Sequence, residues 1–215
     1  NRISLIHAHY VFPTGALALM AKLLFKIPFV VTAHGGDLDQ MAKKHPSIQK
    51  LTRKILNEAS AVIVVGAGLK NDVMKNYGVI EQKIHVLSMG VNTKVFKNSD
   101  KTGALISLNL PMESKKILYV GNVIRNKGIV ELVEAFETLQ HEYSLYLVGS
   151  TKDEGFVDEV KQMIKERDIL NIFFIPPQKQ ADLFLWMNAC DVLVLPSYHE
   201  GFGLVALEGL ACGIP

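Results

Sequence analysis

Short apolar runs rich in β-branched residues alternate with helix-length amphipathic segments along almost the whole sequence. This alternation is typical of parallel βαβ units, because two parallel strands need a long crossover and a helix supplies it. The clearest helical segment carries Ile129, Leu132, Val133 and Phe136 on one face. The pattern predicts an α/β protein. We expect strands at residues 4–7, 29–32, 61–65, 84–87, 116–120, 144–148, 172–175 and 192–195.

A stretch of weaker pattern divides the sequence. Residues 99–114 contain Asp100, Gly103 and Pro111 and few side chains that need burial, so we expect a linker there. The length of 215 residues leaves about 100 for each side, which is enough for two small domains. We therefore expect two α/β domains with mostly parallel sheets, at residues 1–98 and 115–215, whose ligands bind at the carboxyl ends of the strands.

Both ends of the sequence are expected to be internal to a longer chain. Asn1, rather than Met, stands almost directly before a strand-like run. At the other end, Gly213 and Pro215 follow a helical segment and lead toward a further element.

The mean hydropathy of +0.21 raises the question of a membrane span. The best candidate window, residues 11–33, carries Lys22 and Lys26 near its middle, and a central Lys costs roughly 2.5–3.5 kcal/mol. We therefore expect no span. Cys190 and Cys212 stand in apolar surroundings without a CxxC partner, which indicates reduced core thiols of a cytoplasmic protein and no zinc site.

Charge is unevenly distributed along the sequence. Residues 1–100 hold 13 Lys and Arg against 6 Asp and Glu, whereas the remainder holds 10 against 15. Many of the positive charges fall on one expected helix, at Lys43, Lys44, Lys50, Arg53 and Lys54. This face is either simply solvated or in contact with anionic lipid at the inner side of a membrane. Nucleic acid is disfavoured, because no aromatic residues interleave with the cations to stack on bases.

Several motifs suggest other chemistries but are incomplete. Gly66 and Gly68 follow a strand, yet Asn71 stands where a dinucleotide fingerprint needs a third small residue. Asp37 and Asp39 form a DxD pair without further carboxylates nearby, so we expect no metal. The sequence contains no Walker A, HExxH or GxSxG motif.

A strand-to-helix segment near the end of the sequence carries two carboxylates, Glu200 and Glu208. Its glycines predict a tight turn, after which the backbone N–H groups of Phe202, Gly203 and Leu204 point out of a helix N-terminus and favour a diphosphate. Each carboxylate can accept two hydroxyl hydrogen bonds, so the pair suits a nucleotide sugar. The alternative is that Glu200 is an ordinary loop carboxylate and Glu208 an ordinary carboxylate on a helix face.

Residues 200–208 resemble the E-x7-E motif of the GT4 family of retaining glycosyltransferases, which have the GT-B fold of two Rossmann-like domains. Three other segments resemble this family in the same order. They are residues 118–128, similar to its GR…KG loop, residues 32–37, similar to its T-x-H-G-x-D strand end, and residues 86–92, similar to its NGVD turn. The resemblance covers essentially the whole sequence but not a whole family member.

The resemblance implies a donor site in the second domain. Glu200 would contact hydroxyls of the donor sugar and Glu208 the ribose, with backbone from Gly201 to Leu204 nearby. Lys127, just before an amphipathic helix, would bind the diphosphate, and a solvated Lys is the alternative. The family's usual Arg is replaced by Asn122, and Arg125 is the candidate to compensate.

The resemblance implies an acceptor site in the first domain. His34 follows a strand and precedes Gly35, and the family has a His here beside the reaction centre, with Asp37 on the same loop. A buried structural His is the alternative. His7 and His9 also close a strand and are expected to be structural.

The expected function is transfer of a sugar from a nucleotide diphosphate-sugar to a saccharide or lipid-linked hydroxyl acceptor, with retention of configuration and without metal or cofactor. His34, Lys127 and Glu200 would be catalytic. Two alternatives remain open: a nucleotide-sugar hydrolase or epimerase of the same fold, and a binding module without chemistry. The sequence does not select the nucleotide, the sugar or the acceptor.

Overall fold

The computed structural model describes residues 3–42 and 45–215, without the side chains of residues 39 and 40. The chain forms two compact units, residues 1–89 with 200–202 and residues 90–199 with 203–215. Each unit has one parallel sheet of four strands, as the alternating pattern predicts. No helix in the described part of the chain is long and apolar enough to cross a membrane.

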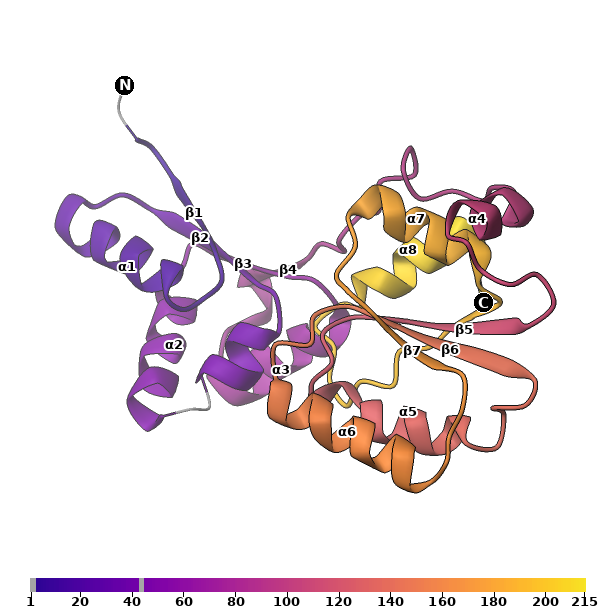
Figure 1. The fold of residues 1–215 in the computed structure, drawn as a ribbon. Coiled ribbons are helices and arrows are strands. Elements are labelled where there is room, and N and C mark those ends of the chain that lie inside the picture. The colour runs from indigo at the N-terminus through magenta and orange to yellow at the C-terminus, as the bar shows by residue number, and fades with distance from the viewer. Residues whose placement is uncertain (1–2, 43–44) are drawn as a thin grey trace. The chain divides into compact units, whose positions relative to one another are not determined.

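The first unit has the strand order β1-β2-β3-β4. Its elements are β1 (Ile6–His9), α1 (Thr14–Phe25), β2 (Phe29–Ala33), a π-helical turn (Asp37–Met41), α2 (Pro46–Glu58), β3 (Ala61–Val64), α3 (Ala67–Tyr77), a 3-10 turn (Glu81–Lys83) and β4 (Ile84–Val86). The helices α1, α2 and α3 lie on one face of this sheet (Figure 1). Ala8, Val31, Val62 and Ile84 form one row across the strands and are buried beneath the helices.

The first strand lies two residues later than predicted, at Ile6–His9 rather than residues 4–7. The parallel register with β2 decides this, since Ile6 pairs with Phe29 and His9 with Thr32. The predicted basic helix corresponds to α2, which begins at Pro46. Lys43 and Lys44, which were predicted to belong to this helix, fall outside the described residues.

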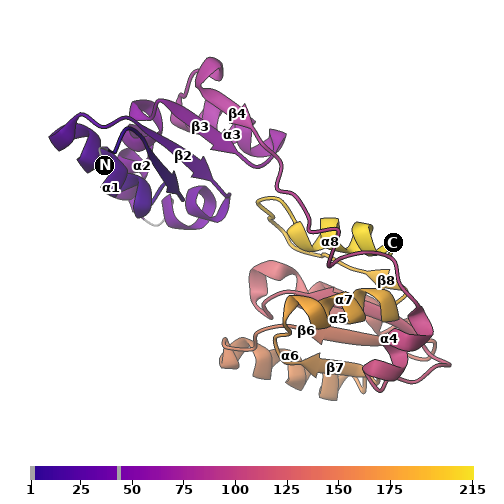
Figure 2. The same ribbon diagram turned by 90° about the horizontal axis from the view of Figure 1, so that it is seen from above.

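The second unit has the strand order β7-β6-β5-β8. Its elements are α4 (Lys101–Ser107), β5 (Lys115–Val120), a 3-10 turn (Arg125–Lys127), α5 (Ile129–Phe136), β6 (Tyr143–Val148), α6 (Glu154–Glu166), β7 (Ile172–Ile175), α7 (Gln180–Ala189), β8 (Val192–Leu193) and α8 (Leu204–Cys212). The helices α5 and α6 lie on one face of the sheet and α7 and α8 on the other (Figure 1). In the perpendicular view α8 lies beside β8 (Figure 2).

Burial on both faces explains the continuous apolar run of β5. Ile117 and Tyr119 pack toward α5 and α6, whereas Leu118 and Val120 pack toward α7 and α8. Cys190 belongs to the second of these cores, and both cysteines are free and buried, as expected.

The segment 99–114, expected to be a linker, is part of the second unit and contains α4. Ala104 and Leu105 are buried with Ala189 of α7. The Asp100 carboxylate caps the helix by accepting hydrogen bonds from the backbone N–H groups of Thr102 and Gly103. The division between the units instead lies between residues 89 and 90.

Candidate functional site

The strand order of the second unit brings two loops to one place. β5 lies between β6 and β8, so the chain reaches β6 and β7 on one side of β5 and returns to β8 on the other. In parallel α/β sheets, ligands bind at such a reversal of strand order, outside the carboxyl ends of the strands. The loops that leave β5 and β8 here are the ones that carry the predicted donor-site residues.

The loop after β5 is held by hydrogen bonds from a side chain of β5 and to the loop after β6. The Tyr119 hydroxyl donates to the carbonyl oxygen of Asn122 at 2.8 Å, and the N–H of Val123 donates to the carbonyl of Ser150 at 2.9 Å. The 3-10 turn Arg125–Lys127 follows, and Lys127 is half-buried there. Lys127 therefore stands directly before the N-terminus of α5, as the sequence predicts, where the helix dipole also favours an anion.

Arg125, the candidate to replace the missing Arg at position 122, is directed to α6. Its guanidinium forms an ion pair with Glu159 and lies 5.0 Å from the centroid of the Phe156 ring. The Asn122 side chain is exposed. The two cations of this turn therefore have different surroundings. Arg125 contacts α6, whereas Lys127 lies at the N-terminus of α5.

Gly128 lets this turn approach the loop after β8. Its φ is +66°, a left-handed conformation that side chains disfavour, and a Cβ at this position would lie 2.2 Å from the carbonyl oxygen of Pro196. The next loop residues add hydrogen bonds: the N–H of Tyr198 donates to the carbonyl of Asn126 at 3.3 Å, and the Tyr198 hydroxyl donates to the Glu131 carboxylate. The two loops therefore form one assembly.

Tyr198 was not predicted as part of this assembly. The hydrogen bond lowers the pKa of the Glu131 carboxyl and raises the pKa of the Tyr198 hydroxyl, since it stabilises the charged acid and the neutral phenol. No signal in the sequence pairs these residues, because only the adjacency of β5 and β8 brings them together.

The helix α8 begins at Leu204, as predicted, with Gly203 as its N-cap at a φ of +73°. The first N–H groups of a helix have no intrahelical acceptor, so those of Leu204 and its successor are directed out of the N-terminus. Glu200, Gly201 and Phe202 occupy the loop between β8 and α8, and the Glu200 side chain is exposed there.

Glu208 lies inside α8 and is only 6% exposed. Burial alone raises the pKa of its carboxyl, because the charged form loses its hydration. A buried carboxylate is costly without a partner, and perturbed acids of this kind gather at functional sites. In this environment the Glu208 carboxylate can accept a hydrogen bond from a hydroxyl group of a ligand.

In the first unit, Asp37 organises the ends of two strands. Its Oδ1 accepts hydrogen bonds from the backbone N–H groups of His34 (3.1 Å) and Gly35 (3.0 Å), and its Oδ2 accepts one from Val11 (2.8 Å). The carboxylate is 1% exposed. Asp37 was predicted to lie on the acceptor side, and its contacts give it a supporting role for the His34 loop.

His34 follows β2, as predicted, and lies in a group of rings. Its Nε2 is 3.2 Å from the Nδ1 of His9, and its ring centroid is 4.7 Å from that of Tyr10. Burial lowers the pKa of His34 below 6.5, and the neighbouring His9 and His7 lower it further, while Asp37 opposes them.

The sequence interpretation missed His9 and Tyr10 as neighbours of His34. His7 has the expected structural contact, since its Nε2 lies 2.8 Å from the Thr32 hydroxyl. The signal for His9 and Tyr10 was their position at the carboxyl end of a strand that runs parallel to β2. In the described part of the chain, no group of three or more His, Cys, Asp or Glu could hold a metal ion.

Comparison with known families matches both halves of the chain. Residues 100–215 match the family described as Glycosyl transferases group 1, and residues 1–95 match the one described as Glycosyltransferase Family 4. The candidate teichuronic acid biosynthesis glycosyltransferase TuaC of Bacillus subtilis is 31% identical over 98% of this chain and 51% of its own length. A D-inositol 3-phosphate glycosyltransferase of Streptosporangium roseum is 29% identical over 100% of this chain and 53% of its own.

Solved structures show the same architecture. Sucrose-phosphate synthase from Thermosynechococcus elongatus has a TM-score of 0.86 and 27% identity, over 99% of this chain and 55% of that one. Anabaena HepE, crystallised with UDP and glucose, has a TM-score of 0.87 at 21% identity, over 99% and 58%. The chain spans about half the length of the curated relatives it matches.

Proposed function

Because the chain belongs to the glycosyl transferases group 1 family and has the GT-B fold of two Rossmann-like units, we propose that the whole protein is a retaining glycosyltransferase. It moves a sugar from a nucleotide diphosphate-sugar to a hydroxyl acceptor in the synthesis of a cell-surface polysaccharide or glycolipid. The observation that carries this proposal is the assembly of the Lys127 turn with the loop from Pro196 to Tyr198 at the strand-order reversal.

The donor binds at this assembly. Lys127 and the N-termini of α5 and α8 hold the diphosphate, which attracts both a cation and unpaired backbone N–H groups. Glu200 accepts hydrogen bonds from hydroxyls of the sugar, and the buried Glu208 carboxylate accepts them from the ribose.

The chemistry depends on stabilising the leaving group. Negative charge develops on the nucleotide diphosphate as the glycosidic bond breaks, and preorganised Lys and N–H donors stabilise it without reorganising. The departing phosphate takes the proton of the acceptor hydroxyl, and no metal is needed. His34, carried on the loop fixed by Asp37, presents the acceptor.

We further propose that the protein works in the cytoplasm at the inner face of a membrane, on a saccharide or lipid-linked acceptor. The buried free thiols support a reducing compartment, and the excess of positive charge in residues 1–100 supports contact with anionic lipid. Nucleic acid is not a partner in this proposal.

The test uses the intact protein. Nucleoside diphosphates are first screened by thermal shift, and the corresponding sugar donors are then supplied with candidate acceptors while the products are analysed. A new glycoside with retained configuration supports the proposal. Free sugar or an epimer would indicate the hydrolase or epimerase instead, and donor binding without turnover would indicate a binding module.

Two variants examine the residues. Lys127→Ala and Glu200→Ala should each lower kcat/KM by roughly 100-fold or more, since they remove charge-assisted contacts to the leaving group and sugar. Lys165→Ala, which removes an exposed cation at the C-terminal end of α6, is the matched control and should retain activity. Normal turnover by the Lys127 and Glu200 variants would refute the site assignment.

A further inference from the structure

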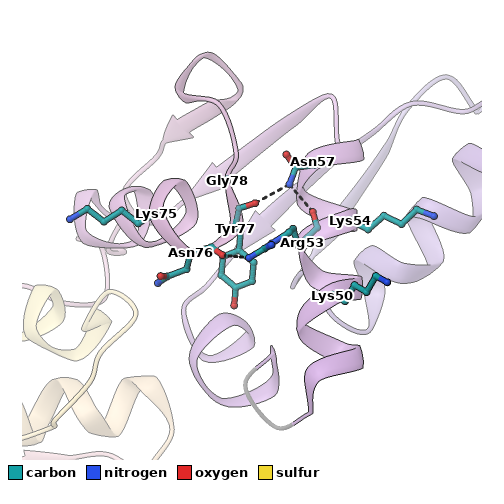
Figure 3. Close-up of a pocket in the computed structure, with 8 residues that line it drawn as sticks. All are labelled: Lys50, Arg53, Lys54, Asn57, Lys75, Asn76, Tyr77 and Gly78. Carbon is teal, nitrogen blue, oxygen red and sulfur yellow. Dashed lines mark hydrogen bonds between the residues drawn. The ribbon is translucent and has the colours of Figure 1, made fainter.

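An open pocket of about 700 Å³ lies in the first unit between α2 and the C-terminal end of α3 (Figure 3). Its volume is comparable with that of pockets that hold small ligands. The lining includes the cations Lys50, Arg53, Lys54 and Lys75, and none of the described residues that line it is acidic. A ligand in this pocket would therefore meet positive charge without a competing carboxylate.

The α2 side of the pocket is a single stripe of that helix. Lys50, Arg53, Lys54 and Asn57 follow the spacing i, i+3, i+4 and i+7, which places them on one face. At about 1.5 Å per residue the stripe is about 10 Å long. Ile55 is buried on the opposite face, so the packing of α2 turns the stripe outward.

The C-terminal end of α3 is modified by contacts from this stripe. The last carbonyl groups of a helix carry the negative end of its dipole and would repel an anion. Here the Arg53 guanidinium donates a hydrogen bond to the carbonyl oxygen of Asn76 at 2.9 Å, and the Asn57 amide donates one to the carbonyl oxygen of Tyr77 at 3.1 Å. Donors from α2 thus offset the negative helix end on this side of the pocket.

Three ammonium groups surround these contacts. Lys50, Lys54 and Lys75 are exposed, and the part of the chain that the structure describes gives them no ion pair. In Figure 3, Lys50 and Lys54 extend on one side of Arg53 and Lys75 extends on the other. Cations separated in this way suit a ligand with several separated anionic groups better than a single phosphate.

The carboxylates near the pocket in the sequence have other partners. Glu58 and Glu81 are paired with lysines that do not line the pocket. The Asp72 carboxylate accepts a hydrogen bond from the side-chain amide of Asn76. The pocket lysines are therefore available to a ligand.

The uncharged groups of the pocket narrow the class of ligand. Tyr77 is only 2% exposed and its hydroxyl donates to the carbonyl oxygen of Leu38, so it offers no ring face on which a base could stack. No other described residue of the lining has a large apolar side chain, whereas membrane attachment combines cations with inserted apolar groups. A flat bilayer would also reach the rim of the hollow and leave its interior unfilled.

A saccharide chain with anionic groups fits both parts of the lining. Its carboxylate or phosphate groups can contact the ammonium groups. Asn57 and Asn76 use their side-chain NH2 groups in the hydrogen bonds described above, which leaves each side-chain oxygen as an acceptor for a sugar hydroxyl.

The pocket is separate from the His34 loop. In a parallel sheet each helix runs back from the carboxyl end of one strand to the amino end of the next, so the C-terminal ends of α2 and α3 lie toward the amino ends of the strands. His34 follows the carboxyl end of β2. A ligand in the pocket would leave the acceptor side of the candidate site free.

We propose that this pocket is a second saccharide-binding site, which holds a chain bearing carboxylate or phosphate groups at a distance from the His34 loop. The inference rests on the proposed synthesis of a cell-surface polysaccharide, because the growing polymer is the chain that could extend from one site to the other. The membrane contact proposed above then depends on other cations of residues 1–100.

The experiment titrates the intact protein, without donor, with oligogalacturonate and with a neutral malto-oligosaccharide of the same length. We expect calorimetry to show binding of the carboxylated chain that weakens with salt, and no binding of the neutral chain. The triple variant Lys50→Gln, Lys54→Gln, Lys75→Gln should bind oligogalacturonate roughly 10- to 100-fold more weakly. Replacing the same lysines by Arg keeps the charge and should keep binding.

The matched control removes the same net charge elsewhere. Lys26→Gln, Lys161→Gln, Lys165→Gln changes exposed lysines outside the pocket and should bind oligogalacturonate like the wild type. An equal loss in this control, or unchanged affinity in the pocket variant, would overturn the proposal. So would binding of the protein to vesicles of phosphatidylcholine and phosphatidylglycerol without binding of oligogalacturonate, which would assign the pocket lysines to a membrane.

Failure of this proposal is distinguishable from failure of the proposed function, because the titrations contain no donor. The pocket variant should also keep normal turnover on a short acceptor. With a long anionic acceptor its KM should rise while kcat stays unchanged, since the pocket binds the chain away from the reacting hydroxyl.

Discussion

The Oδ2 of Asp37 lies 2.8 Å from the backbone nitrogen of Val11, and this hydrogen bond ties the loop after β1 to the loop after β2. The other carboxylate oxygen accepts from the N–H groups of His34 and Gly35. One buried side chain thus holds the position of the candidate acceptor-side His34.

Asp37→Asn should destabilise the protein and disturb His34. An amide offers only one acceptor oxygen, so at least one buried N–H loses its partner, at a cost of about 1–3 kcal/mol. Urea unfolding measures the loss. Asp158→Asn, at an exposed position of α6, is the control and should change stability little. Equal stability of Asp37→Asn and wild type would show that the three hydrogen bonds contribute nothing.

His34 should make stability depend on pH. Because burial lowers its pKa in the folded state below 6.5, the unfolded state takes up a proton first as the pH falls through 6.5. The folded state therefore loses relative stability until the pH passes below the lowered value. We expect His34→Gln to lose less stability than the wild type between about pH 8 and about pH 5. If urea unfolding showed that His34→Gln and the wild type lose equal stability over this pH range, the lowered pKa of His34 would be contradicted.

Glu208 should have the opposite dependence. Burial raises its pKa above 4.5 in the folded state, so the native protein binds this proton more tightly than the unfolded chain. Stability is then lost as the pH rises from 4.5 through the raised value. Glu208→Gln should accordingly raise the Tm at about pH 7, have little effect at about pH 4 and weaken donor binding. Glu142→Gln, at an exposed position, should do none of these.

Gly128→Ala should weaken the candidate donor site. The positive φ alone costs an alanine about 1–2 kcal/mol, and the new Cβ would collide with the carbonyl of Pro196. Thermal unfolding and nucleoside diphosphate affinity should both decrease. Gly155→Ala in α6 meets nothing within 4 Å and should be neutral or stabilising by about 0.5–1 kcal/mol. If Gly128→Ala kept full affinity for the nucleoside diphosphate, the close approach of the two loops would not be required for donor binding.

Arg125 and Lys127 should differ although both are cations of one turn. Arg125 is paired with Glu159, so Arg125→Gln should change stability by at most about 1 kcal/mol and donor affinity by only a few-fold. Lys127→Gln should reduce donor affinity by roughly 10- to 100-fold. Calorimetric titration with the preferred nucleoside diphosphate distinguishes them. A larger loss in Arg125→Gln would mean that this side chain leaves Glu159 to bind the donor.

Local patterns in the sequence were sufficient for the two parallel sheets, the start of α8 at Leu204 and the position of Lys127 before α5. These features depend on the period of apolar residues and on glycine and capping signals, which act over a few positions. The helix α4 was missed because its apolar side is short, although Asp100 was a visible N-cap signal. Its burial depends on Ala189, which lies far away in the sequence.

The sequence by itself determined the α/β class and the motif residues His34, Lys127, Glu200 and Glu208. Only the tertiary structure decided how each is surrounded. Strand order joined Tyr198 to Glu131, packing of α6 engaged Arg125, and burial shifted the pKa of Glu208. The physical reason is that charge, burial and hydrogen bonding at a site depend on neighbours brought together by sheet topology, whereas periodicity and capping are local properties of the chain.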